Sequence, residues 1–159
     1  MNKLLLMIMT AGILLTGCTQ TGLVHDKSYL RAVYIGKNNE MTLVFFSDDE
    51  MLETYGSDID SAIKLAEIKG GKPIVTGFTE LIILGECDEA EVLEYMLNDW
   101  KVSPSCLVIE ERHSDELLRK YSPERIEGAI REAEKQGKIK DCSIVAVLSE
   151  IIKKHDSVR

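Results

Sequence analysis

Cysteines and histidines are the residues of this chain that are best suited to covalent catalysis, because a thiol becomes a nucleophile when an imidazole takes its proton. The sequence contains four cysteines and three histidines. Cys106 lies in a predicted strand and His113 follows it, so these two residues form the best candidate for a thiol-dependent centre. No third group is placed to orient the imidazole, and the pattern is more typical of an exposed loop histidine near a strand cysteine.

Metal and phosphate sites need spacings that this sequence lacks. It contains no His-Glu-x-x-His and no Cys-x-x-Cys. The acidic residues 48–50 (DDE) lack the alternating oxygen ligands and the turn glycine of a calcium loop. Residues 70–72 (GGK) follow a predicted helix and precede Pro73, whereas a phosphate-binding loop follows a strand and precedes a helix. We therefore expect no metal, no cofactor and no enzymatic activity.

Cys18 offers a different chemistry, because it stands directly after Leu15, Thr16 and Gly17. These four residues resemble a lipobox, the site where bacterial lipoprotein signal peptidase cuts before a cysteine whose sulfur carries diacylglycerol. Lys3 and a short apolar run precede them, which is typical of a secretory signal. The run is shorter than the ~20 apolar residues of a membrane-spanning helix. An ordinary signal peptide with a coincidental cysteine is the alternative.

The lipobox divides the chain into four expected segments. Residues 1–17 would form a lipoprotein signal peptide, 18–28 a lipidated tether, 29–154 a single domain and 155–159 a polar tail. Each buried methylene of a lipid contributes about 0.8 kcal/mol, so two acyl chains hold a protein stably on a bilayer. We therefore expect the diacylglycerol on Cys18 to anchor the domain to the lipid bilayer, on the extracytoplasmic face of the cell membrane.

The net charge restricts the partners of the protein further. The chain carries 19 basic and 27 acidic residues, a net charge of −8, which argues against nucleic acid and against electrostatic adhesion to anionic lipid.

With Cys18 lipidated, Cys87, Cys106 and Cys142 remain, and this odd number gives no obvious disulfide framework. Each lies next to apolar sequence, so we expect buried free thiols, with one disulfide among the three as the alternative.

The apolar periodicity predicts an α/β (α+β) fold, with a mixed sheet in the order ββαβαβ and C-terminal helices packed on it. Residues 29–35 and 41–47 are predicted to form a β-hairpin. The nearly continuous apolar run at residues 80–84 predicts a strand buried on both faces, followed by a helix and by a last strand at residues 105–110.

Helix starts are predicted from capping residues. Ser57, with Asp60 three residues later, is expected to cap the first helix, which the glycines at positions 70–71 end. Three further serines are expected to cap the C-terminal helices, and one of them precedes Pro123. These serines are Ser114, Ser122 and Ser143.

Five segments of the expected domain form a distributed pattern. They are residues 32–36 (AVYIG), 62–66 (AIKLA), 77–86 (GFTELIILGE), 92–99 (VLEYMLND) and 133–139 (AEKQGKI). Together with the lipobox, these segments resemble the N-terminal domain of the spore-germination lipoproteins of the Ger(x)C family, which are the C subunits of germinant receptors.

The resemblance implies a non-enzymatic accessory subunit of a germinant-receptor-like complex. It would lie on the outer surface of the inner spore membrane, beside membrane-embedded receptor subunits. A stand-alone lipoprotein that holds a small ligand in a cleft near the strand ends is the alternative function.

Overall fold

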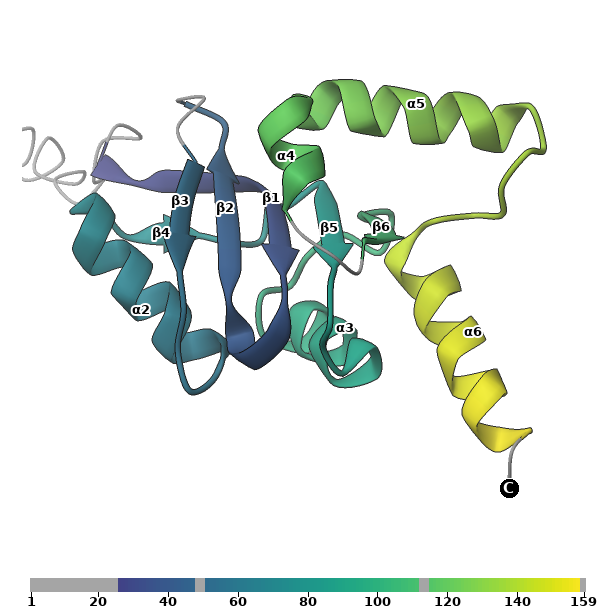
Figure 1. Ribbon diagram of the computed structural model, residues 1–159, viewed down its shortest axis with the longest axis horizontal. Helices are drawn as coiled ribbons and strands as arrows, with labels where there is room; N and C mark the ends of the chain where they lie inside the picture. Colours follow the sequence, from purple (N-terminus) through teal and green to yellow (C-terminus); the bar gives the residue numbers. More distant parts are fainter. Residues whose placement is uncertain (1–25, 48–50, 112–114, 158–159) are drawn as a thin grey trace, which may run out of the picture.

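A computed structural model describes residues 26–47, 51–111 and 115–157 of the chain. These residues form a mixed sheet of six strands with helices packed against it (Figure 1), which confirms the predicted fold class. The strands are β1 (Ser28–Ile35), β2 (Met41–Phe45), β3 (Met51–Thr54), β4 (Ile74–Val75), β5 (Leu81–Leu84) and β6 (Leu107–Glu110). Five of them lie in the order β3-β2-β1-β5-β6, and β4 pairs with the start of β1.

The helices divide between the two faces of the sheet. They are α2 (Ile59–Gly70), α3 (Glu89–Asn98), α4 (Glu116–Lys120), α5 (Pro123–Lys135) and α6 (Ile144–Asp156), with a 3-10 turn at Lys37–Asn39. Helices α2, α3 and α6 cover one face, where Trp100 and Met96 join the larger apolar core. Helices α4 and α5 pack on the other face through Leu118, Ile126 and Ile130 (Figure 1).

The predicted hairpin and the predicted central strand are both present. Strands β1 and β2 are antiparallel, and the turn between them contains Asn38 and Asn39, each with a positive φ. Strand β5 lies between β1 and β6 and is parallel to both. Its four side chains are fully buried because helices cover the sheet on both faces. The sequence β5, α3, β6 is therefore the βαβ unit that the apolar pattern predicts.

Two short strands were not predicted. Strand β3 pairs antiparallel with β2, and β4 pairs parallel with β1 through two residues. Strand β3 (MLET) has only four residues, which is too few to show a clear alternation of apolar and polar side chains, and β4 has only two. The six predicted elements therefore occur along the chain in the predicted order ββαβαβ, with β3 added after β2 and β4 added before β5.

The start of α2 is also corrected. Asp58, not Ser57, is the N-cap, and its Oδ1 accepts a hydrogen bond from Ser61 N at 2.7 Å. In return, the Asp58 N–H donates to Ser61 Oγ at 3.1 Å, which completes a capping box one residue later than expected. Gly71, with φ of 68°, ends the helix as predicted.

The C-terminal helices begin near their predicted caps. Ser122 precedes Pro123 at the first position of α5, and Ser143 precedes α6, although neither serine side chain makes a capping hydrogen bond. Asp115 is the N-cap of α4, while Ser114 lies outside the described residues.

Both expected ends of the domain shift slightly. Strand β1 begins at Ser28, inside the expected tether 18–28, because the Ser28 N–H donates to the Pro73 carbonyl at 2.9 Å. Helix α6 continues through His155 to Asp156, inside the expected tail 155–159, since polar residues in an exposed last turn do not end a helix.

Candidate functional site

Several residues singled out by sequence lie outside the described residues. These are the lipobox residues Leu15, Thr16, Gly17 and Cys18, the acidic residues 48–50, and the histidines at positions 25 and 113. The assignments made for them therefore stay predictions. His155 is described, and it is exposed in the last turn of α6.

The three cysteines of the expected domain are unpaired. Cys106 is buried at the start of β6, while Cys87 and Cys142 are only half-buried, so the expectation of burial is confirmed for one thiol. Cys106 and Cys142 pack into the cores on opposite faces of the sheet, which separates their side chains.

The environment of Cys106 does not suit a nucleophile. Burial, and then the nearby carboxylates of Glu127 and Glu80, raise the pKa of this thiol to about 12. Its Sγ donates weakly to the Leu107 carbonyl at 3.8 Å. A thiol with such a pKa stays protonated at neutral pH, whereas a nucleophilic cysteine needs the thiolate.

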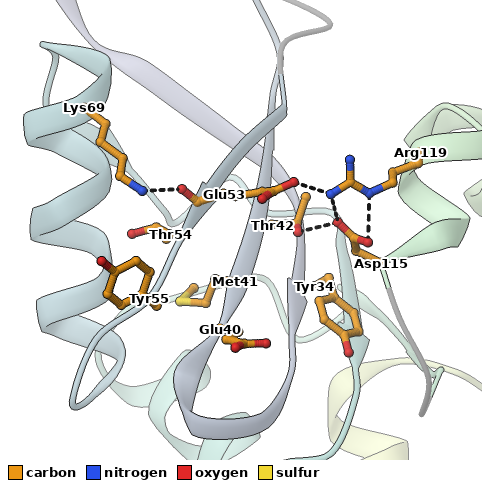
Figure 2. Close-up of a pocket in the computed structure, with 10 residues that line it drawn as sticks. All are labelled: Tyr34, Glu40, Met41, Thr42, Glu53, Thr54, Tyr55, Lys69, Asp115 and Arg119. Carbon is orange, nitrogen blue, oxygen red and sulfur yellow. Dashed lines mark hydrogen bonds and ion pairs between the residues drawn. The ribbon is translucent and has the colours of Figure 1, made fainter.

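A polar cleft of about 470 Å³ lies over β1, β2 and β3, between α4 and α2 (Figure 2). Acidic, basic and aromatic side chains share its wall. The lining residues are Tyr34, Glu40, Met41, Thr42, Glu53, Thr54, Tyr55, Lys69, Asp115 and Arg119. Its volume falls in the range of about 300–1,000 Å³ that is usual for sites of small ligands.

The register of the sheet places three of these side chains in one row. Tyr34 of β1 pairs with Thr42 of β2, and Thr42 pairs with Glu53 of β3. Directly opposed residues of antiparallel strands point to the same face, so the row faces α4. Helix α4 supplies Asp115 and Arg119 from above this row, and α2 supplies Lys69 across the edge strand (Figure 2).

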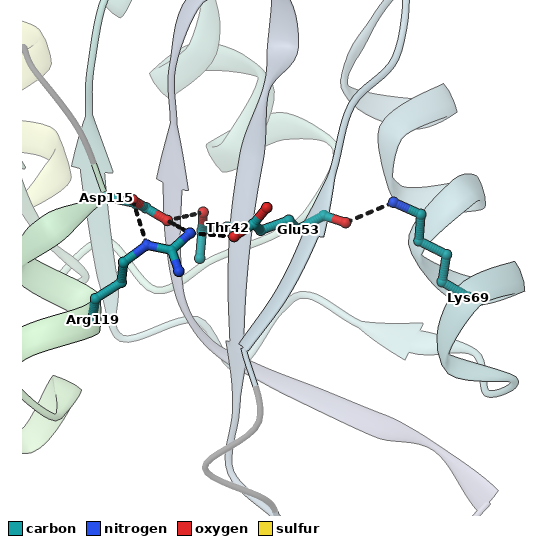
Figure 3. Close-up of polar contacts among 5 residues, drawn as sticks. All are labelled: Thr42, Glu53, Lys69, Asp115 and Arg119. Carbon is teal, nitrogen blue, oxygen red and sulfur yellow. Dashed lines mark hydrogen bonds and ion pairs between the residues drawn. The ribbon is translucent and has the colours of Figure 1, made fainter.

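A polar network connects α4 to the sheet (Figure 3). Thr42 Oγ1 donates to Asp115 Oδ2 at 2.7 Å, and Arg119 Nε donates to Asp115 Oδ1 at 2.9 Å. The Arg119 Nη2 lies 2.9 Å from Asp115 Oδ2 and also pairs with the Glu53 carboxylate. One arginine is thus held by two carboxylates from different elements, a geometry that the planar guanidinium favours.

Lys69 contacts the other end of the same row. Its Nζ donates to the Glu53 backbone carbonyl at 2.8 Å and lies 5.4 Å from the centre of the Tyr55 ring. The side chain of Tyr55 is 64% exposed, so the ring stands open to a ligand.

The network also sets the protonation of its members. Burial alone would raise the pKa of Asp115, but the hydrogen bonds from Arg119 and Thr42 lower it overall. Hydrogen bonds to Asp115 and Glu53 raise the pKa of Arg119. Burial, followed by the carboxylates of Asp115 and Glu40, raises the pKa of Tyr34, so its hydroxyl stays protonated at neutral pH.

The lowered pKa of Asp115 predicts a loss of stability in acid. A carboxyl with a folded-state pKa below its unfolded value of about 3.9 stabilises the fold above that value and stops doing so as the pH falls through the folded pKa. We expect the difference in unfolding free energy between the native protein and Asp115→Asn to be largest near neutral pH and to shrink below about pH 4. Urea unfolding at several pH values measures it, and a difference independent of pH would contradict the assignment.

A second polar cluster fixes α5 on the same face. Arg31 Nε lies 3.2 Å from Glu80 Oε2 and 4.0 Å from Glu127 Oε1, and the guanidinium also pairs with Glu124. Its carbon Cζ lies 5.0 Å from the centre of the Phe46 ring. Arg31 belongs to β1, and its carboxylate partners come from the segment before β5 and from α5, so the cluster holds the helix on the sheet.

A smaller cleft of about 320 Å³ lies where α2 and α3 begin, next to the turn after β1. Asp58 and Asp88 line it, and each accepts a hydrogen bond from the first turn of its own helix. The helix N-termini are thereby capped by acidic groups of the chain itself. In the part of the chain that the structure describes, no group of three or more acidic, histidine or cysteine side chains is arranged to hold a metal ion.

One pair of residues in this site has a spacing that is visible in the sequence alone. Asp115 and Arg119 are spaced i, i+4 on a helix, a spacing that brings opposite charges together. Glu53 could not be assigned to the cleft, because the strand that carries it was not predicted. No sequence pattern assigned Lys69 to the site, because its contact with β3 joins a helix to an unpredicted strand.

Comparisons with protein-family models, with curated proteins and with solved structures find no match to this chain. Among residues 26–47, 51–111 and 115–157, no helix has the length and apolar character required to cross a bilayer.

Proposed function

We propose that this chain is a lipoprotein anchored through Cys18 on the extracytoplasmic face of a membrane. The observation that carries the proposal is the position of Cys18 directly after Leu15, Thr16 and Gly17, at the end of a short apolar run that follows Lys3. Diacylglycerol on the Cys18 sulfur supplies two acyl chains, which is enough for stable attachment to a bilayer.

Within this proposal, the domain acts as an accessory subunit of a spore germinant-receptor-like complex. The five segments that resemble the Ger(x)C N-terminal domain support this assignment. Three of them, residues 62–66, 77–86 and 92–99, lie in α2, around β5 and in α3, and they contribute to the same core. The expected partners are membrane-embedded receptor subunits.

The proposed role is non-enzymatic. The raised pKa of Cys106 supports this part of the proposal, since a protonated thiol does not serve the thiol-dependent chemistry considered above. The subunit would work by attachment at two points, the lipid on Cys18 and a protein surface against its partner. Confinement to the membrane raises the effective concentration of the partner, so that a weak interface is sufficient.

The receptor assignment is tested by purification from spore membranes. The full-length protein with a C-terminal tag should be recovered from the inner spore membrane together with a multi-span membrane protein. Recovery from vegetative cells only, or from spores without any membrane partner, would contradict the receptor role while leaving lipid anchoring open to its own test.

A stand-alone ligand-binding lipoprotein is a second candidate function. The polar cleft over β1, β2 and β3 favours it, because it combines the volume of a small-ligand site with charged groups of both signs. A ligand that binds only the folded protein raises its melting temperature. A screen of small metabolites in which none shifts the melting temperature of the full-length protein would argue against this candidate.

A further inference from the structure

Three aromatic residues gather where the chain enters the sheet, at the start of β1. The ring of Tyr29 lies edge-on to the ring of Phe78, with 5.6 Å between the two ring centres. The Phe46 N–H donates to the Tyr29 carbonyl at 3.0 Å, which places a third aromatic residue beside the pair. We call Tyr29, Phe46 and Phe78 the aromatic patch.

The aromatic patch leaves apolar surface in contact with water. Phe78 is 60% exposed, and Phe46 is exposed as well. Among residues 26–47, 51–111 and 115–157, both apolar cores of the domain form without these three rings. Apolar surface that gathers at one place outside the core marks a site of contact with a protein or with a membrane.

A fixed turn presents Phe78 to the solvent. The N–H and the Oγ1 of Thr79 both donate to the Thr76 carbonyl, at 3.0 Å and 2.6 Å, and Thr79 itself is buried. A Cβ atom at Gly77 would lie 3.2 Å from the Trp100 carbonyl oxygen, so the turn also packs closely against the segment that follows α3. The exposure of Phe78 is therefore built into the fold.

The position of the patch along the chain connects it with Cys18. Ser28, the first residue of β1, follows Cys18 by ten residues, which span at most about 35 Å. A compact domain of this size is itself roughly 35 Å across. A lipid on Cys18 would therefore hold the start of β1 near the bilayer, whereas α6 lies at the opposite end of the longest axis of the molecule (Figure 1).

Exposed lysines border the aromatic patch. Lys27 directly precedes β1, and Lys72 directly precedes Pro73, whose carbonyl accepts a hydrogen bond from the first N–H of β1. Lys101 belongs to the segment that packs against the turn of Phe78. Lysines at a membrane surface extend their ammonium groups to the lipid phosphates. Asp26 carries the opposite charge beside Lys27, so the rings supply the main attraction.

We propose that the aromatic patch lies in the head-group region of the bilayer that holds the Cys18 lipid, with Tyr29 and Phe78 inserted between lipids and α6 directed away. Aromatic rings are favoured in this region, where one side is apolar and the other is wet. The proposal rests on the proposed lipid attachment and adds the orientation of the domain. Because the lipid already confines the domain to the bilayer, a patch of a few side chains is sufficient.

The test places one tryptophan at each end of the molecule. Phe78→Trp adds an indole to the patch, and Ile152→Trp adds one at an exposed position of α6. The native Trp100 is 7% exposed and supplies the background signal. Each full-length variant is purified in detergent from bacterial membranes and reconstituted into phosphatidylcholine vesicles, with or without bromine on the acyl chains. Bromine quenches an indole that enters the bilayer.

We expect brominated vesicles to lower the emission of Phe78→Trp relative to the native protein and to leave that of Ile152→Trp unchanged. Iodide in the water should quench Ile152→Trp more strongly than Phe78→Trp. Phe46→Trp is a second probe in the same patch and should lose emission in brominated vesicles too, which guards against a local disturbance by the first variant. All three positions are exposed, so these changes should leave the fold intact, which circular dichroism checks.

Flotation of the vesicles in a density gradient separates the two levels of the proposal. If the native protein did not float with the vesicles, lipid attachment would be rejected and the orientation with it. If the protein floated while both patch probes kept their emission, attachment would stand and the orientation would be overturned, which would leave the patch to a protein partner. Quenching of Ile152→Trp in place of Phe78→Trp would set α6 against the bilayer and also overturn the proposal.

Discussion

Replacing Ile82 by alanine is expected to lower the free energy of unfolding by about 2–5 kcal/mol, since the change removes buried methylene groups and leaves a cavity. Ile82 is fully buried in β5, where it packs into the core beneath α2, α3 and α6. Strand β5 lies between two parallel neighbours, so its backbone cannot move to fill the space. Because a domain of this size is stable by only about 5–15 kcal/mol, this loss is a large fraction of the total.

Ile68→Ala is the matched control, because it makes the same chemical change on a side chain that is 78% exposed in α2. We expect it to change the free energy of unfolding by about 0.5 kcal/mol or less. Urea unfolding, followed by the fluorescence of the single tryptophan, Trp100, measures both variants. Equal effects of the two changes would contradict the central position of β5.

Gly56→Ala is the second change with a large expected effect. A Cβ atom at position 56 would lie 2.4 Å from Ser61 Oγ and 2.5 Å from the backbone nitrogen of Ala62. The backbone of a helix cannot yield easily, so the capping box of α2 must open. We expect a loss of roughly 2–4 kcal/mol, which combines a lost cap with local overpacking.

Asp58→Ala separates these two causes, because it removes the capping carboxylate without adding an atom near the helix. It should cost about 1 kcal/mol, the usual effect of a lost N-cap. If Gly56→Ala proved no more destabilising than Asp58→Ala in the same urea titration, the close approach of Gly56 to the helix would be refuted.

The elements that could be predicted are those whose local pattern and final environment agree. The run Leu81–Leu84 is apolar throughout, and it is buried on both faces. Ser122 before Pro123 marks the start of a helix in any context, and α5 begins there. The hairpin of β1 and β2 likewise follows from a turn between two runs of β-forming residues.

The candidate site could not be predicted, because it depends on a pairing between distant segments. Glu53 faces α4 only because β3 pairs with β2 in a register that sets Thr42 opposite Glu53. Strand β3 is four residues long and mixes apolar with polar side chains, so it left no clear signal. The contact between Glu53 and Arg119 joins residues far apart in the chain.

The residue that caps the N-terminus of α2 also could not be predicted from the sequence alone. Ser57, Asp58 and Ser61 are all residues that cap helices, and their types alone do not decide between them. The hydrogen bonds select Asp58, since its carboxylate and the hydroxyl of Ser61 satisfy each other's backbone N–H groups. A difference of one position in the cap follows from this reciprocal geometry.

Lipid attachment at Cys18 is the claim on which the proposed location and function depend. Labelling of the native bacterium with radioactive palmitate tests it directly, with Cys18→Ser as the variant and Cys142→Ser as the control for the loss of a half-buried thiol. We expect the label in the native protein and in Cys142→Ser, both in the membrane fraction, and no label in Cys18→Ser. A native protein without label, or a Cys18→Ser protein labelled as strongly as the native one, would contradict the account.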